Sequence, residues 1–539
     1  MNYNITYMKM KKFNILHLIP VVFFSAMIFN ACTDLDIEVE SELTPENFPT
    51  QPEHFEAAKG PIYSNLPSAY AIDYWRLQSL PTDEVLIPAR GGNWDDGGIY
   101  RELHKHTWTK DHSIVRGIWE YGFRGISSCN QILTMFDNVP EGDLRNKQFA
   151  EIRMMRAFYY FLMLDNFGNV PILEKFGDDT PTSSRADVFA FIESEILDIL
   201  PYLPTAKDAT TYGRPTKWMG HALLAKMYLN SKVYTGQAKW SEAVAQCDLI
   251  IKSGLFSLDS DYKSMFLPTN GPGVKEFIFA IVYDAFKITG NSFTRYSLTP
   301  EIKDKYELGS RSPSNCMKTL PEFYDKFNLP GDVRNTTWLI GPQFNNNGTP
   351  ITVKTTYIKL DETYTGPPRD TVWQLNFTRE IWLRGDPLKM DTGNDWLAQY
   401  MGARSIKFYP DKNWDPVSRS DNHDFPVFRY ADILMMKAEA ILQGASATEG
   451  DTPMSLVNQI RNRAKAPLFE ADPTLAELLD ERAREFVWEG WRRNDMIRFG
   501  IYKDKCLFKD TESEKYRELF PIPASQMNLN PKLVQNPGY

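Results

Sequence analysis

Hydrophobic residues recur every three or four positions along much of the chain, which is the spacing of one face of an α-helix. The pattern is continuous over 113–138, and it predicts a long helix there with Ser113 as the N-cap. A second long helix is predicted over about 146–167, because Gly168 follows it as a stop signal. A third is expected after Ser184. The first half of the chain therefore reads as a series of packed helices.

The helical pattern continues through two shorter segments and returns near the C-terminus. Thr216 is placed to cap one of the shorter helices, and the other ends at Gly254. Four consecutive helices with alanine and aromatic seams resemble tetratricopeptide-type pairs, although their period is stretched beyond about 34 residues. Further helices are predicted over 430–442, 454–464 and 475–499.

The stretch 256–425 lacks this periodicity, because clusters of Gly, Pro, Asn and Thr interrupt it repeatedly. We interpret it as a loop-rich lobe, which is the natural place for ligand specificity. The predicted fold is therefore mainly α: a tetratricopeptide-like helical-repeat scaffold, formed from both ends of the chain, with a loop-rich mixed lobe inserted.

The N-terminus has the order of an export signal. Lys9, Lys11 and Lys12 precede a mostly apolar run over 15–29, and a small residue stands directly before Cys32. This order is also that of a bacterial lipobox, so we predict that Cys32 is lipidated and becomes the first residue of the mature protein. An uncleaved membrane anchor is the alternative, but the apolar run barely reaches the ~17 residues that cross a bilayer.

An acidic segment follows the signal. Six acidic residues and no basic residue lie between positions 34 and 46, so this part should stay solvated and act as a tether. The predicted organisation is a signal peptide over 1–31, an acidic lipoprotein tether over 32–52, an N-terminal helical-repeat region over 53–255, the loop-rich ligand-specificity lobe over 256–425 and a C-terminal helical region over 426–539.

The charge balance argues against nucleic acid as a partner. The chain has 60 basic and 69 acidic residues, a net charge of −9, and thus no basic field of the kind that binds phosphate backbones. The four cysteines other than Cys32 are far apart and include no C-x-x-C pair, so neither a zinc cage nor a disulfide framework is predicted. We expect them to be mostly buried small hydrophobic residues.

Signatures of common enzyme classes are absent from the sequence, including zinc-protease, serine-hydrolase, Walker and dinucleotide motifs. We therefore expect no catalytic residues and no cofactor. A glycosidase needs only two suitably spaced carboxylates, so a surface glycoside hydrolase stays open as a lower alternative.

Two groups of residues were considered as metal ligands. His104, His106 and His112 lie close together, but a third ligand at helical spacing is lacking. The segment 411–422 opens with the acidic spacing of a calcium loop, but it lacks the central glycine and the final glutamate. No metal site is predicted from either group.

The stretch 90–98 reads Arg-Gly-Gly-Asn-Trp-Asp-Asp-Gly-Gly. Glycines on both sides would leave the indole of Trp94 exposed beside Asn93, Asp95 and Asp96. The apolar face of a pyranose stacks on such a ring, while amide and carboxylate groups hydrogen-bond its hydroxyls. The alternative is that Trp94 plugs the lobe and the acids cap turns, because most tryptophans are largely buried.

Other aromatic residues could extend this platform. Tyr74 and Trp75 lie shortly upstream, and Trp338, Tyr357 and Trp373 lie in the predicted lobe. Each of them alone is more often a core residue than a ligand contact. The candidate ligand-binding set is therefore a hypothesis about a surface that these residues would share with the stretch 90–98.

Several motifs in a fixed order carry a resemblance along nearly the whole chain. They are Arg153-Met-Met-Arg-Ala-Phe-Tyr-Tyr160 with Phe167-Gly-Asn-Val-Pro171, Gly213-Arg-Pro-Thr-Lys-Trp218, Phe428-Arg-Tyr-Ala-Asp-Ile433, Asn458-Gln-Ile-Arg-Asn-Arg-Ala464 and Gln535-Asn-Pro-Gly-Tyr539. Through them the chain resembles the SusD/RagB family of outer-membrane nutrient-uptake lipoproteins. Charged pairs within them, such as Arg429 with Asp432 and Glu489 with Arg492, sit at helical spacing and are expected to hold helices together.

The resemblance implies a non-catalytic lipoprotein, held in the outer membrane by the lipid on Cys32 and facing the cell exterior. Such a protein binds oligosaccharide or polysaccharide and delivers it to a SusC-like TonB-dependent barrel for import. Some RagB-like members handle peptides, so a peptide-binding uptake receptor is the alternative. The motifs identify the family without identifying the ligand.

Overall fold

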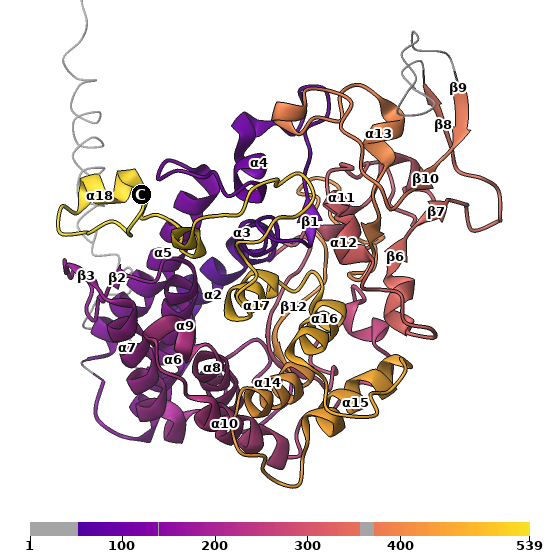
Figure 1. Cartoon of the computed structure of the whole chain (residues 1–539). Helices are drawn as coiled ribbons and strands as arrows, with labels where there is room; N and C mark the ends of the chain where they lie inside the picture. Colours follow the sequence, from indigo (N-terminus) through magenta and orange to yellow (C-terminus); the bar gives the residue numbers. More distant parts are fainter. Residues whose placement is uncertain (1–51, 138, 356–370) are drawn as a thin grey trace, which may run out of the picture. The chain divides into compact units, whose positions relative to one another are not determined.

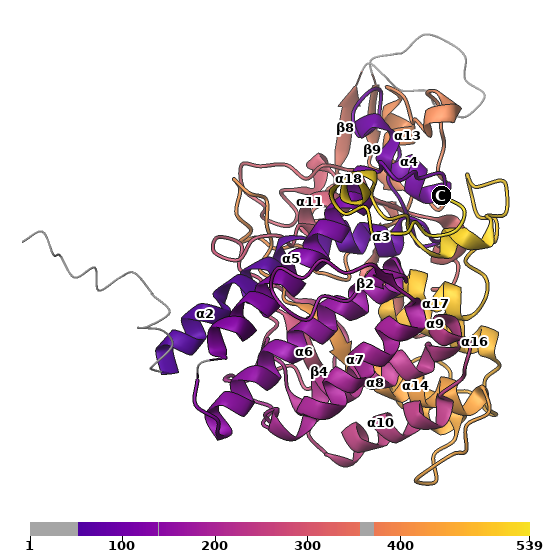
Figure 2. The ribbon, with the colours of Figure 1, turned by 90° about the vertical axis from the view of Figure 1, so that its left-hand side faces the viewer.

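The helices of the first half pack side by side in chain order in the computed structural model, which describes residues 52–137, 139–355 and 371–539 (Figures 1 and 2). Helix α2 lies against α5, α5 against α6, and α6 against α7. The bounds of these helices are Pro52–Asn65 for α2, Ser113–Phe136 for α5, Asp143–Asn166 for α6 and Arg185–Ile199 for α7. The signal, the tether with Cys32, and Tyr357 of the candidate set lie outside the described residues.

Helix α5 approaches α6 closely because two of its inward positions are glycines. A Cβ atom on Gly122 would lie 2.3 Å from the sulfur of Met163, and one on Gly125 would lie 2.4 Å from the ring of Tyr159. Neither distance is one that real atoms adopt, so these positions are restricted to glycine by packing.

The C-terminal helices continue the same helical array. Helix α8 (Lys217–Leu229) packs on α10 (Trp240–Lys252), α10 packs on α14 (Tyr430–Leu442), and α14 packs on α15 (Pro453–Ala464). Figure 1 shows α14 beside α10 although 177 residues, 253 to 429, separate them in the sequence. The scaffold is thus assembled from both ends of the chain, as predicted.

The helix boundaries test the predicted caps. The side chains of Ser184 and Thr216 accept hydrogen bonds from the third residue of α7 and α8. This confirms the predicted cap at Thr216 and makes Ser184 the N-cap of the helix that was expected to follow it. The prediction for α5 was wrong by one residue. His112 is its N-cap, because the imidazole accepts the hydrogen bond from the amide of Val115.

The predicted helix over 475–499 is in fact two helices, α16 (Leu475–Phe486) and α17 (Arg492–Arg498). Between them Trp488 and Gly490 have φ angles of +65° and +75°, a left-handed conformation that ends a helix. The amide of Trp488 donates to the buried carboxylate of Glu84 at 2.7 Å, and this contact favours the break.

The segment between α10 and α14 contains most of the strands. Its first strand β4 (Phe277–Ile281) pairs antiparallel with its last strand β12 (Phe425–Arg429), so the two ends of the loop-rich segment lie side by side. This pair packs on α6, where the ring of Phe158 lies 5.6 Å from that of Phe279. The other strands are short: β1 (Val85–Leu86) with β5 (Lys318–Thr319), β2 (Val170–Pro171) with β3 (Thr182–Ser183), β6 (Trp338–Leu339) with β11 (Arg404–Ser405), β7 (Gly341–Pro342) with β10 (Asn376–Phe377), and β8 (Thr352–Thr355) with β9 (Thr371–Gln374).

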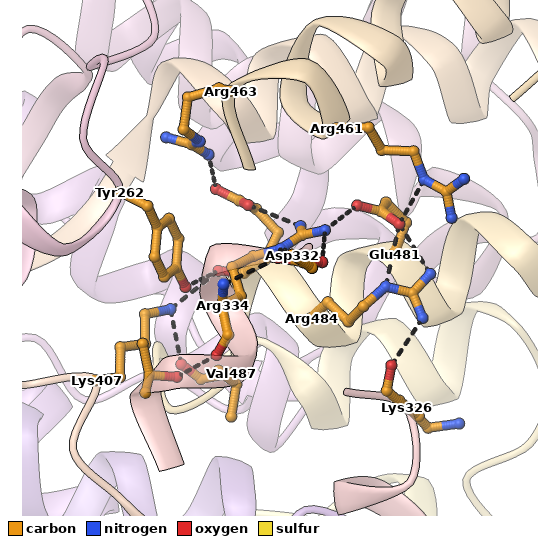
Figure 3. Close-up of polar contacts among 12 residues, drawn as sticks. Tyr262, Lys326, Asp332, Arg334, Lys407, Arg461, Arg463, Glu481, Arg484 and Val487 are labelled. Atoms are coloured by element: carbon orange, nitrogen blue, oxygen red, sulfur yellow. Dashed lines mark hydrogen bonds and ion pairs between the residues drawn. The ribbon is translucent and has the colours of Figure 1, made fainter. Parts of the chain in front are cut away.

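A buried ion network joins this segment to the C-terminal helices (Figure 3). Its centre is the fully buried guanidinium of Arg334, which lies 2.7 Å from Asp332, 2.7 Å from Glu481 and 3.0 Å from Glu485. Both glutamates belong to α16, and they are one turn apart. The network further contains Arg461, Arg463 and Arg484 from α15 and α16.

The charged residues of the family motifs also connect helices and strands, but they do not form the pairs that their spacing in the sequence predicted. Arg429 binds Glu489 at 2.7 Å rather than Asp432. Asp432 instead contacts the ammonium group of Lys226 at 2.6 Å, across to α8. Arg492 contacts Asp83 at 2.6 Å. Each pair therefore links segments that are distant in the sequence.

Two further sequence predictions can be compared with the described residues. Cys129, Cys247 and Cys316 are buried and Cys506 is half-buried, all as free thiols. None of the helices in the described ranges combines the length and the apolar character that a bilayer span requires.

Candidate functional site

The stretch 90–98 folds into a tight loop that is fixed to a second loop. The amide of Arg90 donates to the carbonyl of Asn93 at 2.8 Å, and the amide of Gly91 donates to the Asp391 carboxylate at 2.8 Å. A Cβ atom at position 91 would lie 2.0 Å from the side-chain oxygen of Asn394, and the φ angle of Gly91 is +55°, so this position favours glycine.

Trp94 is presented by strained backbone and supported by two tyrosines. Its φ angle is +63°, a left-handed conformation that is uncommon for a bulky residue. The half-buried indole lies 5.8 Å from the ring of Tyr296, edge to face, and 6.1 Å from that of Tyr100. Such strain persists only where the surrounding contacts hold it, and it is concentrated at functional sites.

A buried cation supports these tyrosines from within. The guanidinium carbon of Arg76 lies 4.8 Å from the ring centre of Tyr296 and 5.4 Å from that of Tyr100. Arg76 also forms an ion pair with Asp73 at 2.9 Å. Cation–π contacts of this kind fix the ring positions, so the support beneath Trp94 is rigid.

The polar neighbours of Trp94 differ in availability. Asn93 and Asp96 are exposed beside the indole. Asp95 is half-buried, and its carboxylate contacts the guanidinium of Arg101 at 3.0 Å, which fixes the loop to the start of helix α4 (Ile99–His104). The amide of Asn93 and the carboxylate of Asp96, which also contacts the Tyr100 hydroxyl, are thus exposed polar groups beside the ring.

Three of the other candidates are core residues, which corrects their assignment to an exposed platform. Tyr74 stacks on Tyr70 with ring centres 4.7 Å apart, and it is 2% exposed. Trp75 is 0% exposed, and its indole nitrogen donates to the carbonyl of Trp488 at 3.0 Å. Trp338 packs edge to face against Phe327. The predicted platform is therefore smaller than its candidate set.

Trp373 is neither fully buried in the core nor part of the loop around Trp94. It lies on β9, is half-buried and packs edge to face against Tyr400 at 5.9 Å, as part of a separate hydrophobic cluster inside the lobe. The residues that support Trp94 but were not identified from the sequence are Tyr100, Tyr296 and Arg76. Tyr296 lies in the short helix α11 (Phe293–Ser297), about 200 residues after Trp94, and nothing in its local pattern connects the two.

The three histidines serve the fold. Each ring contacts a backbone carbonyl: His104 that of Leu507, His106 that of Pro81 and His112 that of Ile99. Burial lowers the pKa of His104 to about 4. No group of three His, Cys, Asp or Glu side chains suited to a metal occurs in the ranges that the structure describes.

A separate open cavity of about 400 Å³ lies elsewhere on the lobe. It is lined by Tyr306 and by the exposed ring of Tyr409, with the ion pair of Lys412 and Glu307 at its rim. This cavity is a competing location for a ligand. Its exposed Tyr409 therefore offers a control for tests of Trp94.

Two family models match the chain. A model described as "SusD family" matches residues 275–539, and one described as "Starch-binding associating with outer membrane" matches residues 62–229. Among curated proteins, the chain is 28% identical to the starch-binding protein SusD of Bacteroides thetaiotaomicron over 86% of this chain and 85% of that protein. It is 24% identical to the SusD-like protein P38 of Formosa agariphila, over 98% of this chain and all of that protein.

Solved structures share the fold. A SusD homologue from Bacteroides thetaiotaomicron matches with a TM-score of 0.70 at 20% identity, over 93% of this chain and 100% of that chain. Surface glycan-binding protein A from the same species, solved in complex with laminarihexaose, matches with a TM-score of 0.67 at 20% identity, over 90% of this chain and 100% of that chain. The predicted mainly α, tetratricopeptide-like scaffold is thereby confirmed.

Proposed function

This chain belongs to the SusD/RagB family, and from that premise we propose that it binds a glycan through a platform formed by Asn93, Trp94 and Asp96. The observation that carries the proposal is the half-buried indole of Trp94, held in a left-handed conformation on two tyrosines beside an exposed amide and an exposed carboxylate. A rigid ring with polar neighbours suits a sugar, which offers an apolar face and a rim of hydroxyls.

The proposal extends to where the protein works. The lipid on Cys32 would hold the body at the outer membrane facing the exterior, and the glycan would pass to a SusC-like TonB-dependent barrel for import. The description of the model that matches residues 62–229 supports the membrane association. The names of the starch-binding and surface glycan-binding relatives support the ligand class.

Calorimetry on the full mature protein tests the platform, with α-glucan and β-glucan hexasaccharides as probes. Trp94→Ala should weaken binding of the hexasaccharide that the native protein prefers by about tenfold or more, because stacked aromatic anchors dominate such interfaces. Circular dichroism checks that the variant is folded.

Tyr409→Ala is the matched control, since it removes an exposed ring from the separate cavity of the lobe. Unchanged affinity in Trp94→Ala together with lost affinity in Tyr409→Ala would move the site to that cavity and refute the proposed platform. Binding of peptides in place of every glycan would favour the peptide-receptor alternative. Release of reducing ends from a bound glycan would favour a hydrolase.

A further inference from the structure

Three arginines lie on segments that come together at the helix carrying Tyr296. Arg295 lies on α11 with its guanidinium carbon 4.9 Å from the ring centre of Tyr296. The segment carrying Arg311 is held there because the amide of Ser314 donates to the carbonyl of Arg295 at 2.7 Å. The loop carrying Arg419 is held at the start of α11, where the amide of Thr294 donates to the Asp421 carboxylate at 2.8 Å.

These arginines have no carboxylate partner in the part of the chain that the structure describes. Arg295 donates only to the hydroxyl of Ser314, at 3.3 Å, and the guanidinium groups of Arg311 and Arg419 form no ion pair within the described ranges. Arg419 stands close enough to the other two that burial, and then their charges, lower its pKa. Three like charges held together without a counter-ion repel each other.

Two further basic side chains, Lys318 and Arg404, lie buried in the layer below the arginines. The ammonium group of Lys318 is fully buried and donates to the carbonyls of Gln399 and Met401, at 2.7 and 2.6 Å. The buried guanidinium of Arg404 likewise contacts only neutral oxygens, among them the carbonyl of Gly402 at 2.6 Å. Burial, and then Arg404, lower the pKa of Lys318 far below its usual range.

This layer lies directly beneath Tyr296. The amides of Cys316 and Met317, next to Lys318, both donate to the Tyr296 carbonyl, at 3.3 and 3.1 Å. The surplus of basic residues is a local feature, because the chain as a whole carries a net charge of −9.

The carboxylates near Trp94 do not neutralise the three arginines. Asp73 is paired with Arg76 and Asp95 with Arg101. The Asp415 carboxylate, close to Arg419 in its loop, accepts from the amides of Val417 and Ser418 at 3.1 and 2.7 Å. Asp96 is exposed beside Trp94 and contacts the Tyr100 hydroxyl.

We propose that the ligand of the Trp94 platform is an acidic glycan, whose carboxylate or sulfate group is bound by Arg295, Arg311 and Arg419. The inference rests on the proposed glycan-binding function and adds the charge of the sugar. Guanidinium groups are the preferred partners of such oxyanions, because they offer two parallel N–H donors to two oxygens. Stacking on Trp94 would then position the ring, and the arginines would select the anionic substituent.

The test compares acidic and neutral oligosaccharides of the same skeleton by calorimetry at low salt. Oligogalacturonate hexamer is paired with its methyl ester, and a sulfated carrageenan hexamer with the unsulfated galactan, which distinguishes carboxylate from sulfate. The native protein should bind at least one acidic probe about tenfold or more tightly than its neutral counterpart. Raising the salt should reduce this preference, because exposed charges are screened.

The triple variant R295Q/R311Q/R419Q should lose the preference while keeping its affinity for the neutral counterpart. The charge-matched control R116Q/K147Q/K252Q changes three exposed cations on other helices and should keep the preference. An equal loss in both variants would overturn the inference, since net charge alone would then explain it.

The remaining outcomes separate the two proposals. Neutral glycans bound through Trp94, with no preference for either acidic probe, would refute the acidic ligand and leave the glycan-binding function standing. A preference that survives in the triple variant would also refute the role of these arginines. Failure of every oligosaccharide to bind would refute both.

Discussion

At the scale of single residues, two tryptophans 19 positions apart have opposite roles. Trp75 is completely buried between Trp488 and Phe293, with ring centres 5.0 and 5.2 Å away. Trp94 is half-buried on a glycine-rich loop. Both were candidates for one platform, although Trp75 alone is more often a core residue. Burial depends on what packs against a ring, and for Trp75 that is a residue from the far end of the chain.

The two tryptophans should therefore respond differently to truncation. Trp75→Ala should lower the free energy of unfolding by about 3–5 kcal/mol, because it leaves a large cavity in the core. Trp94→Ala should cost less than about 2 kcal/mol, because its indole is only partly buried and its removal leaves no enclosed cavity. Urea unfolding of both variants measures the difference, and equal losses would contradict the assignment of Trp75 to the core and Trp94 to the surface.

At the scale of elements, the helices follow the hydrophobic pattern closely where local signals agree. The predicted helix over 430–442 has the observed bounds of α14, and the predicted cap of α8 is correct. The pattern failed over 475–499, where apolar spacing continues but the backbone turns at Trp488 to meet Glu84. The hydrophobic periodicity indicates which face of a helix is buried. It does not indicate a tertiary contact that interrupts the helix.

The seam between α5 and α6 gives a test at this scale. Gly125→Ala should destabilise the protein by about 1–3 kcal/mol, because the new methyl group collides with the ring of Tyr159 and forces the helices apart. Gly117→Ala on the same helix is the control. No atom lies within 4 Å of its added Cβ, so it should be neutral or stabilising by up to about 1 kcal/mol through helix propensity. Thermal unfolding would show both effects, and destabilisation by both variants would contradict the packing argument.

At the scale of the whole molecule, buried charges connect segments that the sequence separates. Arg334 from the lobe contacts two glutamates of α16 about 150 residues later. Burial alone would raise the pKa of Glu481, but the charges of Arg334, Arg484 and Arg461 outweigh it and lower this pKa to about 2. These three arginines therefore keep Glu481 charged although it is buried.

Arg334→Met should lower the free energy of unfolding by about 3–5 kcal/mol, because it leaves buried carboxylates without their partner. Arg379→Met is the control: its pair with Asp325 is exposed, and its loss should cost at most about 1 kcal/mol. Urea unfolding measures both. A neutral result for Arg334→Met would mean that the lobe does not depend on this network.

The pH dependence provides a second readout of the same network. The pKa of Glu481 is lower in the folded state than the value near 4.3 of an unfolded chain, so its contribution is present above about pH 4.3. That contribution is lost as the pH falls from about 4.3 toward 2. The loss should be smaller in Arg334→Met, because one of the charges that lowers this pKa is gone.

The sequence by itself determined the family and the helical scaffold, because helix periodicity, caps and short motifs are local properties of the chain. It also singled out the glycine-rich stretch around Trp94, since glycines on both sides of an aromatic residue indicate an unusual backbone. It overestimated the platform by including Tyr74, Trp75 and Trp338.

Only the tertiary structure decided which aromatic and charged side chains meet. Tyr296 reaches Trp94, and the segments that carry Arg311 and Arg419 come together with Arg295, because both fold against α11. Charge in a sequence can be counted, but whether a charge is paired depends on distances between segments. The surplus of arginines without a carboxylate partner among the described residues, in a chain of net negative charge, is therefore visible only in the folded molecule.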